Sequence, residues 1–341
     1  MRDGAVAATM QRGNPSFAVV CMAKETPELL TQFARYYVSI GAEEVYLFID
    51  GIETPALAVL ATEPRVRLSY VDDTLWEERL GAHARHIGRR QSYIYTCAQH
   101  EMSADWLLIV DADEFLIART PIHDMLANIP DNVDAFMVPP AEAVWGPGDD
   151  IGTPFGATWF RRPLYYPVLS DMLAWALYGR DAGFFRRCML SHTQGKHFVR
   201  RTARFTRIGV HSSRRDGRNV TVGFSRRPKL GVSRSRSSLH SDNEIAHFDA
   251  GSFERWQEKF RRRYTGEIDS TTMKQRHTLA QIRTLERILG SGKPWAREDA
   301  ADLFRRLYSI SRTQVRMMRA LGLAFRAKIF HSPTCVTARE R

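Results

Sequence analysis

The chain has 341 residues, of which 44% are hydrophobic, 11% aromatic and 26% charged, a composition typical of a globular protein. No run approaches the roughly 18 to 20 consecutive apolar residues of a membrane span, and the N-terminus has no signal-peptide core. The four cysteines lie far apart and in no CxxC spacing, which argues against a disulfide framework and a zinc site. We therefore expect a cytoplasmic protein.

The formal net charge of +11 comes from one segment. Between Arg200 and Arg236 lie eleven arginines and Lys229 against a single acid, Asp216, so the rest of the chain is neutral overall. The segment is either a solvated loop or a surface for a phosphate-rich or other anionic partner. A nucleic-acid or polyanion-binding protein that uses residues 200–236 is thus one alternative. The chain has no zinc-finger or helix-turn-helix pattern, which disfavours nucleic acid.

The N-terminal third of the chain predicts strands that alternate with helices. Apolar runs rich in β-forming residues at 17–22 and 45–49 predict two strands, and the pair Thr26-Pro27 between them is typical of a helix start. Residues 65–71 and 106–110 predict two more strands, with a long helical pattern between them. This alternation predicts an α/β fold with a mostly parallel, Rossmann-type sheet that is flanked by helices.

The rest of the chain divides into two parts. From residue 134 to about 223 the helical rhythm fades, and we expect short strands and long loops. Helices return after Ser252, with a break at 290–294 and a last helical region that continues to about Ile329. That region is amphipathic and basic, and either packs on the body of the protein or contacts an anionic membrane surface. We predict a flexible segment over 1–15, one α/β domain over 16–265, and a helical C-terminal extension over 266–341.

Three acids follow the apolar run 106–110 in the order Asp111, Asp113 and Glu114. In open α/β sheets, ligands bind beyond the carboxyl ends of the strands, so these acids are expected in a crevice. In extended geometry Asp111 and Asp113 share one face, which lets their oxygens converge on one divalent cation, Mg²⁺ or Mn²⁺, that also binds substrate phosphates. The plainer alternative is a set of acids that cap a turn or pair with basic residues nearby.

Several motifs, in chain order, resemble the family-2-like glycosyltransferases, a group with a GT-A fold and a DxDEF signature. Residues 106–116, WLLIVDADEFL, are similar to that signature, and residues 23–29, AKETPEL, resemble the family's K-N-E-x-P-x-L opening. Residues 195–200, GKHFVR, resemble its G-K-S-x-V-R, and residues 245–259 its ending. The resemblance covers about residues 17–260 and implies a nucleotide-binding half over about 16–120 and an acceptor half over about 121–265.

The resemblance implies a metal-dependent hexosyltransferase-like enzyme that moves a sugar from a nucleotide-sugar, most readily a UDP-sugar, to a glycan or lipid-linked acceptor. Mn²⁺ or Mg²⁺ would neutralise the leaving diphosphate. A nucleotidyltransferase is the alternative within enzymes, but residues 22–27 lack the glycine-rich loop that it usually carries. The implied metal ligands are Asp111, Asp113 and His247, with His211 in reserve. The residues implied in donor binding are Glu25, Asp50, Gln91, Asp111, Lys196 and Lys259.

An inverting reaction, which we expect, also needs a carboxylate that takes the proton of the acceptor hydroxyl. The sequence does not single one out. Asp149, Asp150 and Asp171 lie in the region where acceptor loops are expected, and each is a candidate base.

Overall fold

The computed structural model describes residues 14–51, 53–151, 153–223, 242–264, 276–290 and 296–330. Nearly all of the segment expected to be flexible lies outside these ranges, as does the part of the basic segment from 224 to 236. Within the described ranges, no helix combines the length and the apolar character needed to cross a membrane.

The larger sheet has seven strands, in the spatial order β13 (Thr221–Gly223), β6 (Ala135–Val138), β9 (Lys196–Arg200), β4 (Trp106–Ile109), β1 (Phe17–Ala23), β2 (Glu44–Asp50) and β3 (Val66–Val71). The four strands β4, β1, β2 and β3 are parallel, and β9 runs antiparallel between β4 and β6. The predicted fold class, α/β with a mostly parallel sheet, is confirmed.

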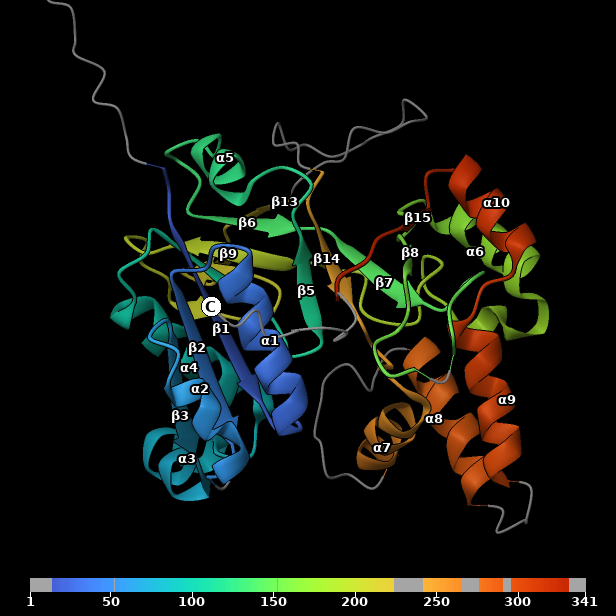
Figure 1. Ribbon diagram of the computed structural model, residues 1–341, viewed down its shortest axis with the longest axis horizontal. Helices are drawn as coiled ribbons and strands as arrows, with labels where there is room; N and C mark the ends of the chain where they lie inside the picture. Colours follow the sequence, from blue (N-terminus) through green and yellow to red (C-terminus); the bar gives the residue numbers. More distant parts are fainter. Residues whose placement is uncertain are drawn as a thin grey trace, which may run out of the picture.

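Helices cover both faces of this sheet, as Figure 1 shows. They are α1 (Pro27–Ser39), α2 (Ala58–Ala61), α3 (Asp73–Leu80), α4 (Ile87–Glu101) and α5 (Ile122–Ala127), with 3₁₀ turns η1 (Pro55–Leu57) and η2 (Gly81–His83). Residues of β1 alternate between the faces: Val19 packs in the core that contains α1, and Val20 in the core that contains α4. The Thr26 hydroxyl accepts a hydrogen bond from the Leu29 amide and caps α1, as the sequence predicts.

A second sheet of five strands has the order β15 (Ala324–Arg326), β8 (Trp159–Arg161), β7 (Pro140–Val144), β14 (Glu244–His247) and β5 (Glu114–Ile117). The helical segments beside it are α6 (Pro167–Tyr178), η3 (Gly179–Phe184), α7 (Phe253–Tyr264), α8 (Arg276–Leu289), α9 (Ala296–Tyr308) and α10 (Arg312–Ala320). A small sheet of β10 (Arg207–Ile208), β11 (Ser213–Arg215) and β12 (Arg218–Asn219) holds part of the basic segment, where Arg215 pairs with Asp134.

Two sequence-based expectations about the C-terminal half are wrong. The stretch expected to hold only short strands and loops contains the 12-residue helix α6, whose outward residues Val168 and Trp175 are apolar and exposed. The last helical region does not continue to Ile329, because the chain turns after α10 and adds β15 to the edge of the second sheet. Val315 and Met318 of α10 are buried, so this region packs on the body of the protein.

Candidate functional site

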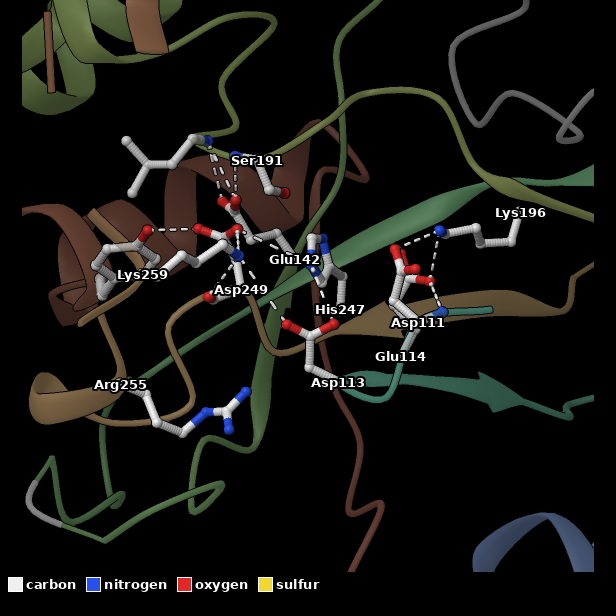
Figure 2. Close-up of polar contacts among 12 residues, drawn as sticks. Asp111, Asp113, Glu114, Glu142, Ser191, Lys196, His247, Asp249, Arg255 and Lys259 are labelled. Carbon is white, nitrogen blue, oxygen red and sulfur yellow. Dashed lines mark hydrogen bonds and ion pairs between the residues drawn. The ribbon is translucent and has the colours of Figure 1, made fainter. Parts of the chain in front are cut away.

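The acids after β4 lie on a turn between the two sheets. The Glu114 amide donates to the Asp111 carbonyl at 3.0 Å, so Ala112 and Asp113 form the turn and Glu114 begins β5. The extended geometry expected for Asp111 and Asp113 is therefore wrong. Figure 2 shows the consequence: the Asp111 carboxylate is directed to Lys196, and that of Asp113 to the side of His247 and Asp249.

Lys196 neutralises the first part of this turn. Its ammonium nitrogen lies 2.5 Å from Asp111 Oδ2 and 3.1 Å from Glu114 Oε2, and its side chain is 1% exposed. Burial acts to raise the pKa of Asp111, but the charge and hydrogen bond of Lys196 outweigh it and hold that pKa below its ordinary value. For Glu114 burial prevails, supported by the other acids, and its pKa is raised. The alternative expectation of an acid paired with a basic residue thus describes Asp111.

The backbone before Lys196 needs a residue without a side chain. A Cβ atom at Gly195 would lie 1.7 Å from the Val138 carbonyl oxygen, a separation no neighbouring side chain can relieve. The same Gly195 carbonyl lies 3.0 Å from Nδ1 of His211, the reserve metal ligand, whose ring stacks on His192 at 4.1 Å between centroids. Burial, with the nearby charge of Lys196, lowers the pKa of His192 to about 4 and that of His211 well below its ordinary value. Both rings are therefore neutral at neutral pH.

The second part of the site is built around Asp249, which lies just beyond the end of β14. His247 Nε2 is 3.7 Å from Asp113 Oδ1 and 3.9 Å from Asp249 Oδ1. Lys259 Nζ donates to Asp249 Oδ1 at 2.6 Å and lies 4.0 Å from Asp113 Oδ2. The hydroxyl of Tyr308, from α9, donates to Asp249 Oδ2 at 2.6 Å. Hydrogen bonds from α7 and from the distant α9 thus fix this carboxylate.

A cavity of about 910 Å³ lies at the carboxyl ends of β1 and β2, and we call it the donor-side cavity. Its lining includes Glu25, Asp50 and Gln91, the three residues implied near the nucleotide. Asp50 is held in place, because Arg90 Nη1 lies 3.2 Å from its Oδ2 and Trp76 Nε1 donates to its Oδ1 at 3.0 Å. The structure therefore brings these predicted residues together at one edge of the sheet.

Helix α7 connects the donor-side cavity to the acids. Arg255 pairs with Glu25 through both terminal nitrogens, with 3.2 Å between Nη2 and Oε1. Lys259 lies one turn further on and contacts Asp249, and Arg262 lines the cavity. These three residues share one face of the helix, whereas Trp256 is buried on the other. This basic face of α7 is thus turned toward the site.

Two of the three candidate bases lie in the loop after β7, and the third lies on α6. The Asp149 carboxylate accepts hydrogen bonds from the Gly146 and Thr158 amides, each at 3.0 Å, and its side chain is 1% exposed. Asp150 accepts from the Thr153 hydroxyl at 3.0 Å in the same loop. Asp171 is exposed on α6.

Asp113 and His247 are the described residues that could hold part of a cation site. Among them, no three histidine, cysteine, aspartate or glutamate side chains are grouped to hold a metal ion. The 3.7 Å between Asp113 Oδ1 and His247 Nε2 is longer than the roughly 3.0 Å between adjacent ligands of octahedral Mg²⁺, so both would bind one ion only after a side-chain rotation that shortens this distance. Such ions commonly take one or two protein ligands and the rest from phosphates and water. Asp111 is engaged by Lys196 instead.

Sequence reasoning missed several residues of this site. Asp249 follows His247 by two positions just after the end of a strand, as Asp111 and Asp113 follow β4. The same strand-end pattern would have identified Asp249 from the sequence. Tyr308 and Arg255 gave no such signal, because each meets its partner through the fold alone.

No protein-family profile matches the chain, and no curated protein matches it in sequence. The solved structures to which the chain is similar include the following three. HddC from Yersinia pseudotuberculosis is 8% identical with a TM-score of 0.35, over 71% of this chain and 96% of its own. S. aureus TarS in complex with UDP is 15% identical with a TM-score of 0.26, over 44% of this chain and 42% of its own. Glucosyl-3-phosphoglycerate synthase from Mycobacterium tuberculosis, in complex with Mn²⁺, UDP and phosphoglyceric acid, is 16% identical with a TM-score of 0.25. The similarity covers 55% of this chain and 56% of that protein's own.

Proposed function

We propose that the protein is a metal-dependent glycosyltransferase that takes a sugar from a nucleotide-sugar, with a UDP-sugar as the first candidate. The proposal rests on one observation: a single face of α7 contacts both the donor-side cavity and the acids. The donor-side cavity at the ends of β1 and β2 offers polar groups for a nucleoside. Arg262 of α7 lines this cavity, and Lys259 on the same helix face contacts Asp249 and lies 4.0 Å from Asp113. A diphosphate between the cavity and these acids would meet the cationic side chains of α7.

The roles follow from these positions. Glu25, Asp50 and Gln91 would contact the nucleoside, and Lys259 the diphosphate. Asp113 and His247 would hold Mn²⁺ or Mg²⁺, which supplies Lewis-acid stabilisation of the leaving diphosphate when bound.

The ion pairs of Lys196 stabilise the turn that carries Asp113. Lys196 fixes the carboxylates of Asp111 and Glu114, so the turn that presents Asp113 is held from one side by a buried ion pair. We propose that Asp111 keeps a role in donor binding through its exposed edge, since its side chain is 38% exposed. A glycan or lipid-linked molecule remains the proposed acceptor, with inversion at the anomeric carbon.

The test measures binding of UDP with and without Mn²⁺ by titration calorimetry, followed by release of UDP from UDP-sugars. Asp113→Asn should abolish the Mn²⁺-dependent part of UDP binding and the turnover. Asp302→Asn, an exposed aspartate on α9, is the matched control and should change neither. Wild-type protein that binds no UDP with Mn²⁺, or an Asp113→Asn variant with full turnover, would remove the proposal. Release of pyrophosphate from a nucleoside triphosphate and a sugar phosphate, with no release of UDP from UDP-sugars, would favour a nucleotidyltransferase.

The base is tested by separate variants. For Asp149 the contacts of its carboxylate predict a loop-stabilising role, so Asp149→Asn should lower the melting temperature and leave kcat of the folded enzyme unchanged. Asp150→Asn and Asp171→Asn should leave the melting temperature nearly unchanged, because these side chains are exposed. A fall in kcat by about 100-fold or more in one of them would identify the base.

A further inference from the structure

A second cavity, lined by arginines, lies against β8 and β15 of the second sheet. The strands β14 and β5 pair antiparallel, with His247 opposite Glu114 at the acid end and Glu244 opposite Ile117 at the far end. Arg119 follows β5 at this far end. The cavity here has a volume of about 670 Å³, and we call it the arginine cavity. The described residues that line it include none of the acids of the candidate site.

Four guanidinium groups and two aromatic rings form its lining, from Arg119, Arg162, Arg319, Arg326, Trp159 and Phe325. No acidic side chain is among the described residues that line it. One wall of the cavity is formed by residues of the segment 312–328, which runs from α10 to β15. This segment has five cationic residues and no aspartate or glutamate. The wall therefore carries positive charge that its own sequence does not balance.

The two inner arginines are held in fixed positions. Arg162 pairs with Glu244 through two contacts, 3.0 Å from Nε and 2.6 Å from Nη2, and donates to the Gly322 carbonyl at 2.8 Å. Arg119 lies 3.6 Å from the same Glu244. Both guanidinium groups lie over the Phe325 ring, at 4.4 Å for Arg119 and 4.3 Å for Arg162. The Glu244 carboxylate thus contacts two guanidinium groups, and both of these stack on the Phe325 ring.

The charges of this pair are incompletely compensated. Burial lowers the pKa of Arg162 to about 10, and burial together with the charge of Arg162 lowers that of Arg119. Asp242 acts in the opposite direction on both. The outer residues add two more cations: Arg319 is exposed, and Arg326 is 56% exposed with its Nη2 atom 4.0 Å from Asp149 Oδ1. An anion in the cavity would reduce this repulsion.

We propose that the arginine cavity binds a phosphate-bearing anion, separately from the acid site. Guanidinium groups match phosphate oxygens with paired hydrogen bonds, and two fixed arginines with two outer ones can contact an anion of two or more charges. The same chemistry is offered by a free oligophosphate and by the headgroup of an anionic lipid. The fixed inner pair gives the site a preformed shape, so binding needs little rearrangement.

The test uses the full chain with EDTA, so that no metal-dependent binding contributes. Inorganic pyrophosphate is titrated by calorimetry into wild type, into Arg319→Glu/Arg326→Glu, and into the charge-matched control Arg283→Glu/Arg297→Glu, whose residues are exposed and outside the cavity. We expect the cavity variant to weaken binding by about tenfold or more, and the control by about twofold or less. The same comparison in an Asp113→Asn background separates this result from the proposed glycosyl transfer.

A second arm distinguishes the sources of phosphate. Sedimentation with phosphatidylglycerol vesicles, against phosphatidylcholine vesicles, should pull down wild type and the control but not the cavity variant if the ligand is a lipid headgroup. Pyrophosphate binding without vesicle binding would assign the cavity to a free anion. If the two double variants lose the same affinity for pyrophosphate and the same binding to vesicles, the cavity is not an anion site and the proposal fails.

Discussion

Substitution Lys196→Met tests whether the acid turn depends on its buried cation. The ammonium is 1% exposed and lies 2.5 Å from Asp111 and 3.1 Å from Glu114. At an effective dielectric constant of about 20, unit charges at these distances attract by roughly 7 and roughly 5 kcal/mol. Burying an ammonium ion costs several kcal/mol, which offsets much of this attraction. We expect the variant to lose about 3–5 kcal/mol of unfolding free energy near pH 7.

The loss should depend on pH in a defined direction. Without the cation, Asp111 and Glu114 face each other, so the pKa of each in the folded variant rises above its value in the unfolded chain. A carboxyl group of this kind stabilises the fold when protonated, and that contribution is lost as the pH rises through the raised pKa. In the wild type the pKa of Asp111 is lowered, so its contribution is lost as the pH falls. The difference between the two proteins should therefore be smaller near pH 4 than near pH 7.

Urea unfolding followed by tryptophan fluorescence at both pH values measures this difference. Lys328→Met is the control, since Lys328 is exposed and its removal should change the unfolding free energy by about 0.5 kcal/mol or less. A loss below about 1 kcal/mol for Lys196→Met near pH 7, or an equal loss at both pH values, would refute the reasoning.

Two further substitutions test the packing around the site. Tyr308→Phe removes the hydroxyl that donates to Asp249 at 2.6 Å, and should lower the unfolding free energy by about 1–3 kcal/mol in urea unfolding; an unchanged value would mean that the hydrogen bond is not formed in solution. Gly195→Ala places a Cβ atom 1.7 Å from the Val138 carbonyl oxygen and should cost about 1–3 kcal/mol or more, measured as a lower melting temperature. Gly183→Ala, where a Cβ atom meets no neighbour within 4 Å, is its control, and equal melting temperatures for the two variants would contradict the predicted clash.

The elements that the sequence predicts well are those whose signal is local. The strands β1, β2 and β4 are apolar runs because both of their faces are buried, and the cap of α1 needs no partner beyond Thr26 and its own first turn. Helix α6 was missed because it is apolar on its exposed as well as its buried side, so no helical period separates Val168 and Trp175 from Leu173.

The types of residue at the site could be predicted from the sequence, but not which side chains contact one another. The carboxylates at the end of β4 were found because strand ends in open sheets carry ligands, and the donor-side residues came from the family resemblance. The partners that fix them lie far along the chain: Lys196 is 85 positions from Asp111, and Arg255 is 230 positions from Glu25. The turn at Ala112 also cannot be read from spacing, because the change of direction is set by the pairing of β5 with β14.

The contact between Tyr308 and Asp249 has a consequence for how this protein can change over evolutionary time. The hydroxyl comes from the C-terminal helical region, and that region also adds β15 to the second sheet. A shortened relative that lost α9 would leave a buried carboxylate oxygen without its donor beside the proposed reaction centre. Recombination that exchanges the C-terminal part as a module would therefore have to bring a substitute hydroxyl with it, which ties the inheritance of the two parts together.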